Sequence, residues 1–449
     1  MIPREPPAPA PPVEGPPRDG PPRDGPQRDG PQRDGPQRDG APHDGPLVLV
    51  VTKPEEVAAV AARCARAERL AVDVEANGLF AFRARLCVLQ LAWREDGTQV
   101  VAIIDSLAAP LAPLAPILGA SGPVKLFHDL SFDVRLLSEH GLEVRNVRDT
   151  SVAARFLGAA STGLATLASE HLGVTLAKGL QEHDWSRRPF TDEQLGYLAA
   201  DVVHLEELDL ALSRSVTERG IEEEVRLEVD FKLTGALAPP KDERPPHVRV
   251  KGYPALDELG KTTLRLLCEA RERLAMERDV PSFRVVRSEL LMRLAEVRPT
   301  TPAAVRQLCQ RDRGAARHAG AWFEAIASAA AVASAEPAPE SAPENAPENA
   351  PENAPAPERA RVDRALSNRR KRGEKLLTAW RRARSEERGV DAQVVLPGHC
   401  VDDVVSLLLG PAIGHDAFAE ALAAIPGFGA ARVARYLDSL SALRTPLSE

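Results

Sequence analysis

Two proline-rich repeats limit where this chain can form a folded core. Residues 16–45 repeat a five-residue unit such as PPRDG or PQRDG, and residues 336–358 read EPAPESAPENAPENAPENAPAPE. Neither run offers large apolar side chains to bury, and glycine at every fifth position excludes collagen, which needs glycine at every third. We therefore predict a disordered tail over 1–45 and an extended linker over 331–359. The predicted folded blocks are 46–240, 245–330 and 360–447.

Composition and charge narrow the class of protein. The 449 residues are 43% hydrophobic and 27% charged, as in soluble folds, and they carry a net charge of −8. Any binding of nucleic acid must therefore use local basic patches. Five separated cysteines without a CxxC pair fit neither a disulfide framework nor a zinc finger, which favours a reducing cytoplasm. We expect neither export nor a membrane span, because apolar runs of the required kind are absent from the sequence.

The order of apolar runs predicts the fold class of each block. In the first block, short strand-like runs alternate with helical ones, as in PLVLVV, EEVAAVAARCARA, LAVDVE, LCVLQLAW, QVVAIID and VKLFHD. Such alternation is typical of an α/β sheet domain. The later blocks have helical periodicity, for example TLRLLCEARERLAMERD and KLLTAWRRARSEERG. They are predicted to be small all-α modules.

Two acids stand close together in the stretch LAVDVEANGLF. Asp73 and Glu75 are two residues apart near the end of a predicted strand, so their side chains point to the same face. Removing such charges from water without a partner costs several kcal/mol, roughly, which indicates a bound cation or an exposed strand end with solvated acids. The pair alone does not decide between these interpretations.

Further acids follow at positions that a fold could bring together. Asp133 lies in KLFHDLSFDVRLL after a short strand, whereas Tyr197 and Asp201 in LGYLAADVVHL are four apart and share a helix face. If they converge with Asp73 and Glu75, they match a site in which carboxylates hold two divalent ions roughly 4 Å apart. Oxygen ligands without a Cys or His cluster favour Mg²⁺ or Mn²⁺ over zinc.

In these motifs the chain resembles the DEDD 3′-to-5′ exonucleases, and most closely the ribonuclease D family. The Asp-x-Glu motif stands in VDVEANG, the second Asp in FHDLSFD, and the Tyr-x-x-x-Asp motif in YLAADV. RDT at 148–150 and HDWSRRPFTDEQ at 183–194 add to the similarity. The resemblance implies a ribonuclease H-like fold, with a mixed sheet flanked by helices. It also implies metal-dependent hydrolysis of RNA from its 3′ end, releasing nucleoside 5′-monophosphates, for example in tRNA maturation.

The resemblance also implies a role for each residue. Asp73, Glu75 and Asp201 would bind the catalytic metal, and Asp133 would help to hold a second. Tyr197 would orient the attacking water. Because a phenol with a pKa near 10 is a poor base at neutral pH, a hydrogen bond is its easier role.

Three basic residues are candidate substrate contacts, and each has a plain structural alternative. His128 lies beside the proposed site, while Lys178 and Arg188 could meet the RNA backbone. A histidine at a strand end is commonly structural, and surface Lys and Arg are commonly solvated. Asp129 is a possible substitute for Asp133, but the helix expected after it favours Asp133.

The later blocks resemble the HRDC module of RecQ-type helicases and ribonuclease D. The second block carries a long helix, the turn RDVPSFRVV and the helix ELLMRLA, and the third block repeats this order. Residues 359–388 contain 12 Lys or Arg against 4 Asp or Glu, so this segment could contact phosphates. Trp380 within it either stacks on a base or belongs to the core. IPGFGAARVARYL resembles a helix-hairpin-helix turn, with a simple helix-helix turn as the alternative.

RNA is therefore the expected partner, no membrane association is expected, and the sequence indicates no particular oligomeric state. Two alternatives remain open: a DNA exonuclease of related type, because the same acids serve either sugar, and a noncatalytic RNA-binding scaffold. The stretch GKTT at 260–263 echoes a P-loop, but Ala255 occupies the place of the first glycine. Helicase activity is not expected.

Overall fold

The computed structural model describes residues 45–177, 179–239, 244–335 and 358–444. Residues 1–44 of the predicted tail and most of the predicted linker lie outside these ranges. All five cysteines are buried and unpaired. Across the described ranges, no helix combines the length and the apolar character that crossing a bilayer requires.

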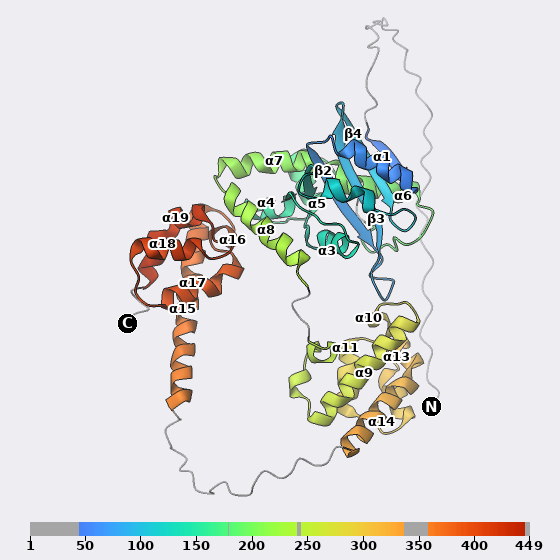
Figure 1. Cartoon of the computed structure of the whole chain (residues 1–449). Helices are drawn as coiled ribbons and strands as arrows, with labels where there is room; N and C mark the ends of the chain where they lie inside the picture. The colour runs from blue at the N-terminus through green and yellow to red at the C-terminus, as the bar shows by residue number, and fades with distance from the viewer. Residues whose placement is uncertain (1–44, 178, 240–243, 336–357, 445–449) are drawn as a thin grey trace, which may run out of the picture. The chain divides into compact units, whose positions relative to one another are not determined.

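A mixed six-stranded sheet forms the centre of the first block, which confirms the predicted α/β class (Figure 1). The strand order is β1-β4-β3-β2-β5-β6. Strands β2, β3 and β4 run antiparallel to their neighbours in this group, whereas the β1–β4, β2–β5 and β5–β6 pairs are parallel. The strands are β1 Leu47–Val51, β2 Arg69–Ala76, β3 Leu86–Glu95, β4 Thr98–Asp105, β5 Val124–Phe127 and β6 Val147–Asp149.

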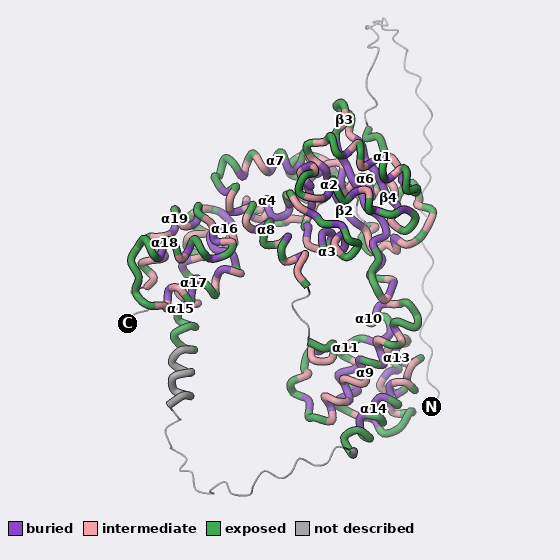
Figure 2. Tube along the Cα trace, viewed as in Figure 1, coloured by how far each residue is buried: buried purple, intermediate pink, exposed green. Residues whose placement is uncertain are grey.

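Helices cover both faces of the sheet (Figure 1), and the strands between them are largely buried (Figure 2). The alternation of side chains along β2 separates two cores. Val72 and Val74 belong to a core shared with α1. Ala71, on the other face, belongs to a core shared with α6. The helices of this block include α1 Pro54–Cys64, α3 Ser131–Glu139, α4 Thr150–Phe156, α5 Leu164–Leu172, α6 Asp192–Val203, α7 Leu205–Glu218 and α8 Glu222–Leu237.

The second block is all-α, as predicted, with its own core around Leu267, Leu291 and Trp322. Its Asp279 accepts hydrogen bonds from the Phe82 backbone and the Arg85 side chain, both at 3.1 Å, which joins it to the β2–β3 loop. Its helices are α9 Glu258–Glu277, α10 Ser282–Val285, α11 Ser288–Val297, α12 Pro302–Cys309, α13 Arg313–Arg317 and α14 Ala319–Ala335.

The third block is also all-α. Trp380 is 8% exposed and donates a hydrogen bond to Ser439 Oγ at 3.1 Å, so the structure places it in the core rather than on a stacking surface. The helices are α15 Glu358–Arg388, α16 Ala392–Val395, α17 Val401–Leu409, α18 His415–Ala423 and α19 Ala430–Ser441. Helix α14 extends to Ala335 and helix α15 begins at Glu358, so each includes a few residues of the span predicted as linker.

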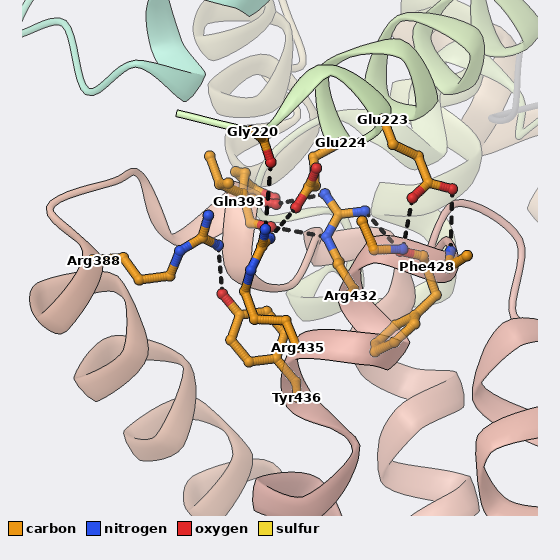
Figure 3. A network of polar contacts seen from close by, with 12 residues as sticks. Gly220, Glu223, Glu224, Arg388, Gln393, Phe428, Arg432, Arg435 and Tyr436 are labelled. Carbon is orange, nitrogen blue, oxygen red and sulfur yellow. Dashed lines mark hydrogen bonds and ion pairs between the residues drawn. The ribbon is translucent and has the colours of Figure 1, made fainter. Parts of the chain in front are cut away.

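The glycine-rich turn before α19 forms a joint with α8 (Figure 3). The Glu223 carboxylate accepts hydrogen bonds from the backbone N–H groups of Ala430, at 3.1 Å, and Ala431, at 2.6 Å. Arg435 pairs with the buried Glu224. Gly429 has φ +82°, and a Cβ there would lie 2.4 Å from Leu227 Cδ1. In this structure the turn therefore holds a carboxylate of the chain itself and serves as a helix–helix joint.

Candidate active site

Three predicted acids meet at the edge of the sheet. One carboxylate oxygen from each of Asp73, Glu75 and Asp201 lies within 4.8 Å of the other two. Asp73 and Glu75 share the face of β2 that carries Ala71, and α6 covers this face. The alternation of side chains along β2 and the packing of α6 on the sheet therefore bring Asp201 close to two acids that lie more than 120 positions earlier in the sequence.

A cavity of about 380 Å³ opens over these acids. Tyr197, His128 and Asp129 also line it, together with Ser151 from α4 and with Thr162 and Gln181 from neighbouring loops. The last three were not predicted from the sequence, because isolated polar residues form no periodic pattern.

Helix α6 starts where its sequence requires. Thr191 accepts a hydrogen bond from the Gln194 backbone at 3.3 Å, and the Gln194 side chain accepts one from the Thr191 backbone at 2.8 Å. This capping box fixes the first turn. Leu198 and Val202 then pack against the sheet, which leaves Tyr197 and Asp201 one turn apart at the cavity.

The acids repel each other and are poorly hydrated. Burial and then the Asp201 charge raise the pKa of Asp73 to about 8. Burial, followed by the Asp73 and Asp201 charges, raises the pKa of Glu75 to about 9, and burial raises that of Asp201 to about 7. A cation would relieve this repulsion. Because the donors are all carboxylate oxygens, the group fits a hard divalent ion such as Mg²⁺ or Mn²⁺.

Tyr197 is held as a hydrogen-bond donor. Burial and then the Asp201 charge raise the pKa of its phenol above the ordinary value, and its hydroxyl is hydrogen-bonded to Asp201. Trp185 stacks on its ring, with the centroids 5.8 Å apart and the planes at 27°. The ring is therefore oriented, and the hydroxyl stays protonated at neutral pH.

Asp133, the residue predicted to help hold the second metal, is not among the residues that line this cavity. Asp133 is in the first turn of α3 and is 6% exposed. It is not one of the three clustered carboxylates, but burial and then the charges of Asp73 and Glu75 raise its pKa well above the usual range. Its neighbour Asp129 lines the cavity instead, with φ +66° and its carboxylate 2.6 Å from Lys232 Nζ.

The candidate substrate contacts differ in their surroundings. His128 lines the cavity, but burial lowers its pKa and Thr150 Oγ1 lies 2.8 Å from its Nδ1, so it is a neutral, anchored ring. Arg188 faces inward, with Asp105 oxygens at 2.6 and 2.7 Å. These contacts favour a structural role for Arg188. Lys178 lies outside the described residues.

Two family models match the chain. The 3′-5′ exonuclease model matches residues 48–217, and the HRDC domain model matches residues 261–326. The chain is 31% identical over 234 residues to ribonuclease D of Haemophilus influenzae, covering 51% of this chain and 58% of that protein. It is 30% identical over 298 residues to ribonuclease D of Gluconacetobacter diazotrophicus, covering 64% and 73%.

The chain spans only part of the length of the first ribonuclease D relatives that it matches. The chain covers 58% of the Haemophilus influenzae protein and 66% of ribonuclease D from Granulibacter bethesdensis.

Among solved structures, Escherichia coli RNase D matches with a TM-score of 0.60 and 22% identity, over 89% of this chain and 99% of that one. That protein is described as an exoribonuclease involved in structured RNA processing. A protein from Bifidobacterium adolescentis matches with a TM-score of 0.65 and 21% identity, over 89% and 100%. These likenesses show a shared fold.

Proposed function

This chain belongs to the ribonuclease D family, and we propose that it is a 3′-to-5′ exoribonuclease that releases nucleoside 5′-monophosphates from RNA 3′ ends. The observation that carries the proposal is the group of Asp73, Glu75 and Asp201 with Tyr197 in one cavity. Precursors of tRNA or other structured RNAs are the proposed substrates. The named function of the relatives supports RNA as the substrate.

The proposed cofactor is a pair of divalent ions, Mg²⁺ or Mn²⁺. Asp73, Glu75 and Asp201 would hold the first, and Asp133 would help to hold the second. Such ions make water more acidic and neutralise the charge that develops on the leaving oxygen. The raised pKa values of these acids support the assignment, because buried carboxylates at this spacing gain most from a cation.

The protein's own groups orient the reaction. Tyr197 keeps its proton and is anchored by Asp201 and Trp185, so we assign it to positioning through a hydrogen bond rather than to proton abstraction. The neutral His128 would line the substrate end of the cavity without supplying a positive charge.

The proposed domain division places the exonuclease at 46–240 and HRDC-like modules at 245–330 and 360–447. The modules would hold RNA through exposed basic side chains, including Arg369 and Lys371 of α15. The unpaired cysteines support a cytoplasmic location.

The test compares cleavage of matched RNA and DNA oligomers labelled at the 3′ or the 5′ end, in Mg²⁺, Mn²⁺ or EDTA. We expect immediate release of the 3′ label and stepwise shortening of the 5′-labelled RNA, both abolished by EDTA and by Asp201→Asn. Glu193→Gln, an exposed acid on the same helix outside the cavity, is the matched control and should cleave normally. Cleavage of DNA alone would favour the DNA exonuclease, and RNA binding without cleavage would favour the scaffold.

A further inference from the structure

A buried carboxylate at the end of β6 bridges two elements beside the cavity. Asp149 is 2% exposed, and its Oδ1 accepts hydrogen bonds from the backbone N–H groups of Ser151, at 2.9 Å, and Val152, at 3.1 Å. Those two bonds cap α4. The same Oδ1 accepts from Asp129 N at 3.2 Å, and Oδ2 accepts from Leu130 N at 3.0 Å. Asp149 therefore also holds the turn between β5 and α3.

Thr150 and Lys232 also contact the turn between β5 and α3. Thr150 Oγ1 lies 2.8 Å from His128 Nδ1 and donates a hydrogen bond to the Phe127 carbonyl at 3.1 Å. From α8, Lys232 Nζ lies 2.6 Å from Asp129 and 3.8 Å from Asp149. The turn is thus held from the β6–α4 junction and from α8, which is about 80 residues further along the chain.

This turn needs outside support. Asp129 has φ +66°, in the left-handed region that is uncommon for residues other than glycine. The turn leads directly into α3, where Asp133 is the third residue, and its own residues His128 and Asp129 line the cavity. A shift of the turn would therefore move a proposed metal ligand and the cavity edge together.

We propose that Asp149 is a positioning residue that fixes Asp133 and the 128–130 turn for the second cation. The inference rests on the proposed function. A carboxylate accepts hydrogen bonds on both oxygens and carries no donor of its own, so it can serve all four of these N–H groups. In asparagine, one oxygen is replaced by an NH₂ group, which must face a backbone N–H and push the turn away.

The test is Mn²⁺ binding to the full chain, measured by titration calorimetry for the native protein and Asp149→Asn. Because loss of a residue that orients a metal ligand weakens binding by roughly tenfold or more, we expect the weaker Mn²⁺ site to lose at least tenfold in affinity. The tighter site, at Asp73, Glu75 and Asp201, should change less than twofold. In turnover, kcat should fall while KM for RNA stays within twofold.

Two further variants separate positioning from capping. Asp312→Asn makes the same exchange at a comparable helix cap, since Asp312 accepts from Ala315 N at 3.0 Å in the second block, and should leave Mn²⁺ binding unchanged. Lys232→Met removes the ammonium group beside Asp129 and Asp149 Oδ2 but leaves the two bonds to Asp149 Oδ1 that cap α4, and it should weaken the same Mn²⁺ site. This variant also tests the proposal if Asp149→Asn fails to fold.

Each contrary result has a separate meaning. If Asp149→Asn folds and its Mn²⁺ affinities are unchanged, the positioning role is overturned while the exonuclease proposal stands. If Asp149→Asn does not fold, unchanged Mn²⁺ affinities in Lys232→Met have the same meaning. Absence of Mn²⁺ binding in the native chain would instead overturn the metal site, and this inference with it.

Discussion

Tyr197 shows how a single residue can be tested without disturbing the site around it. Tyr197→Phe keeps the ring that stacks on Trp185 but removes the hydroxyl bonded to Asp201. If the hydroxyl positions the reacting groups, kcat should fall by about 10² to 10³, with RNA affinity unchanged. Single-turnover cleavage and a binding titration measure the two effects.

A matched tyrosine controls for loss of a hydroxyl as such. Tyr436 in the third block accepts a hydrogen bond from Arg388 at 2.6 Å, so Tyr436→Phe also loses a buried polar contact. It should cleave at the native rate. Native turnover in Tyr197→Phe would remove Tyr197 from the proposed mechanism.

A mutation of Arg188 tests whether this residue is structural or contacts the substrate. Its guanidinium meets Asp105, which is 5% exposed, as well as the carbonyls of Cys87 and Trp185. Arg188→Ala leaves Asp105 unpaired and should cost about 3 kcal/mol of unfolding free energy, after allowing for the partial exposure of the arginine. Denaturant unfolding measures this loss. A normal unfolding curve with a raised KM for RNA would restore the substrate interpretation.

The candidate acids could be predicted from the sequence because each motif is local. Asp73 and Glu75 were placed on one face because side chains alternate along a strand. The same reasoning could not show that Arg188 faces inward, since its partner Asp105 is 83 positions away. Nor could it find Lys232, whose contacts with the 128–130 turn depend on how α8 packs.

At the scale of elements, long periodic segments were predictable and short ones were not. The spans of β2 to β5 follow apolar runs that can be identified directly in the sequence. Strand β6 was missed, because it has three residues, two of them charged, and exists through its pairing with β5. It nevertheless supplies Asp149, so the least predictable strand carries a residue important to the proposed site.

The joint between α8 and α19 gives a prediction for one contact between elements. Glu223→Ala removes the acceptor from the amides of Ala430 and Ala431 and should cost about 1 kcal/mol, as loss of a helix N-cap does. Amide hydrogen exchange should therefore speed up at the start of α19, with cleavage at the native rate. Glu222→Ala, an exposed neighbour on α8, is the control. Unchanged exchange would show that this carboxylate does not hold the joint.

Across the whole molecule, the division into blocks followed from composition, but their packing did not. Val229 and Leu233 of α8 share one apolar core with Leu377 and Trp380 of the third block. Such contacts join segments about 150 residues apart and leave no local pattern.

The clustered acids make the stability of the whole chain depend on pH and metal. In the folded, metal-free state the pKa values of Asp73, Glu75 and Asp201 are about 8, 9 and 7, against roughly 4 when unfolded. Between pH 4 and 9, roughly, the folded chain therefore binds more protons than the unfolded chain, and its stability falls as pH rises. Melting temperatures in EDTA should decline from pH 5 to pH 9.

Divalent metal should reverse this trend, because it replaces the protons that the acids would otherwise need. Mn²⁺ at a hundredfold excess over its Kd adds about 2.7 kcal/mol at any one pH, and its Kd itself tightens as the acids ionise. The gain in melting temperature on adding a fixed Mn²⁺ concentration should thus be larger at pH 8 than at pH 6. Asp201→Asn, which removes one titrating ligand, should reduce both the decline in EDTA and the gain with metal, whereas Glu193→Gln should change neither. A gain that is equal at both pH values would mean that Mn²⁺ binds away from these acids.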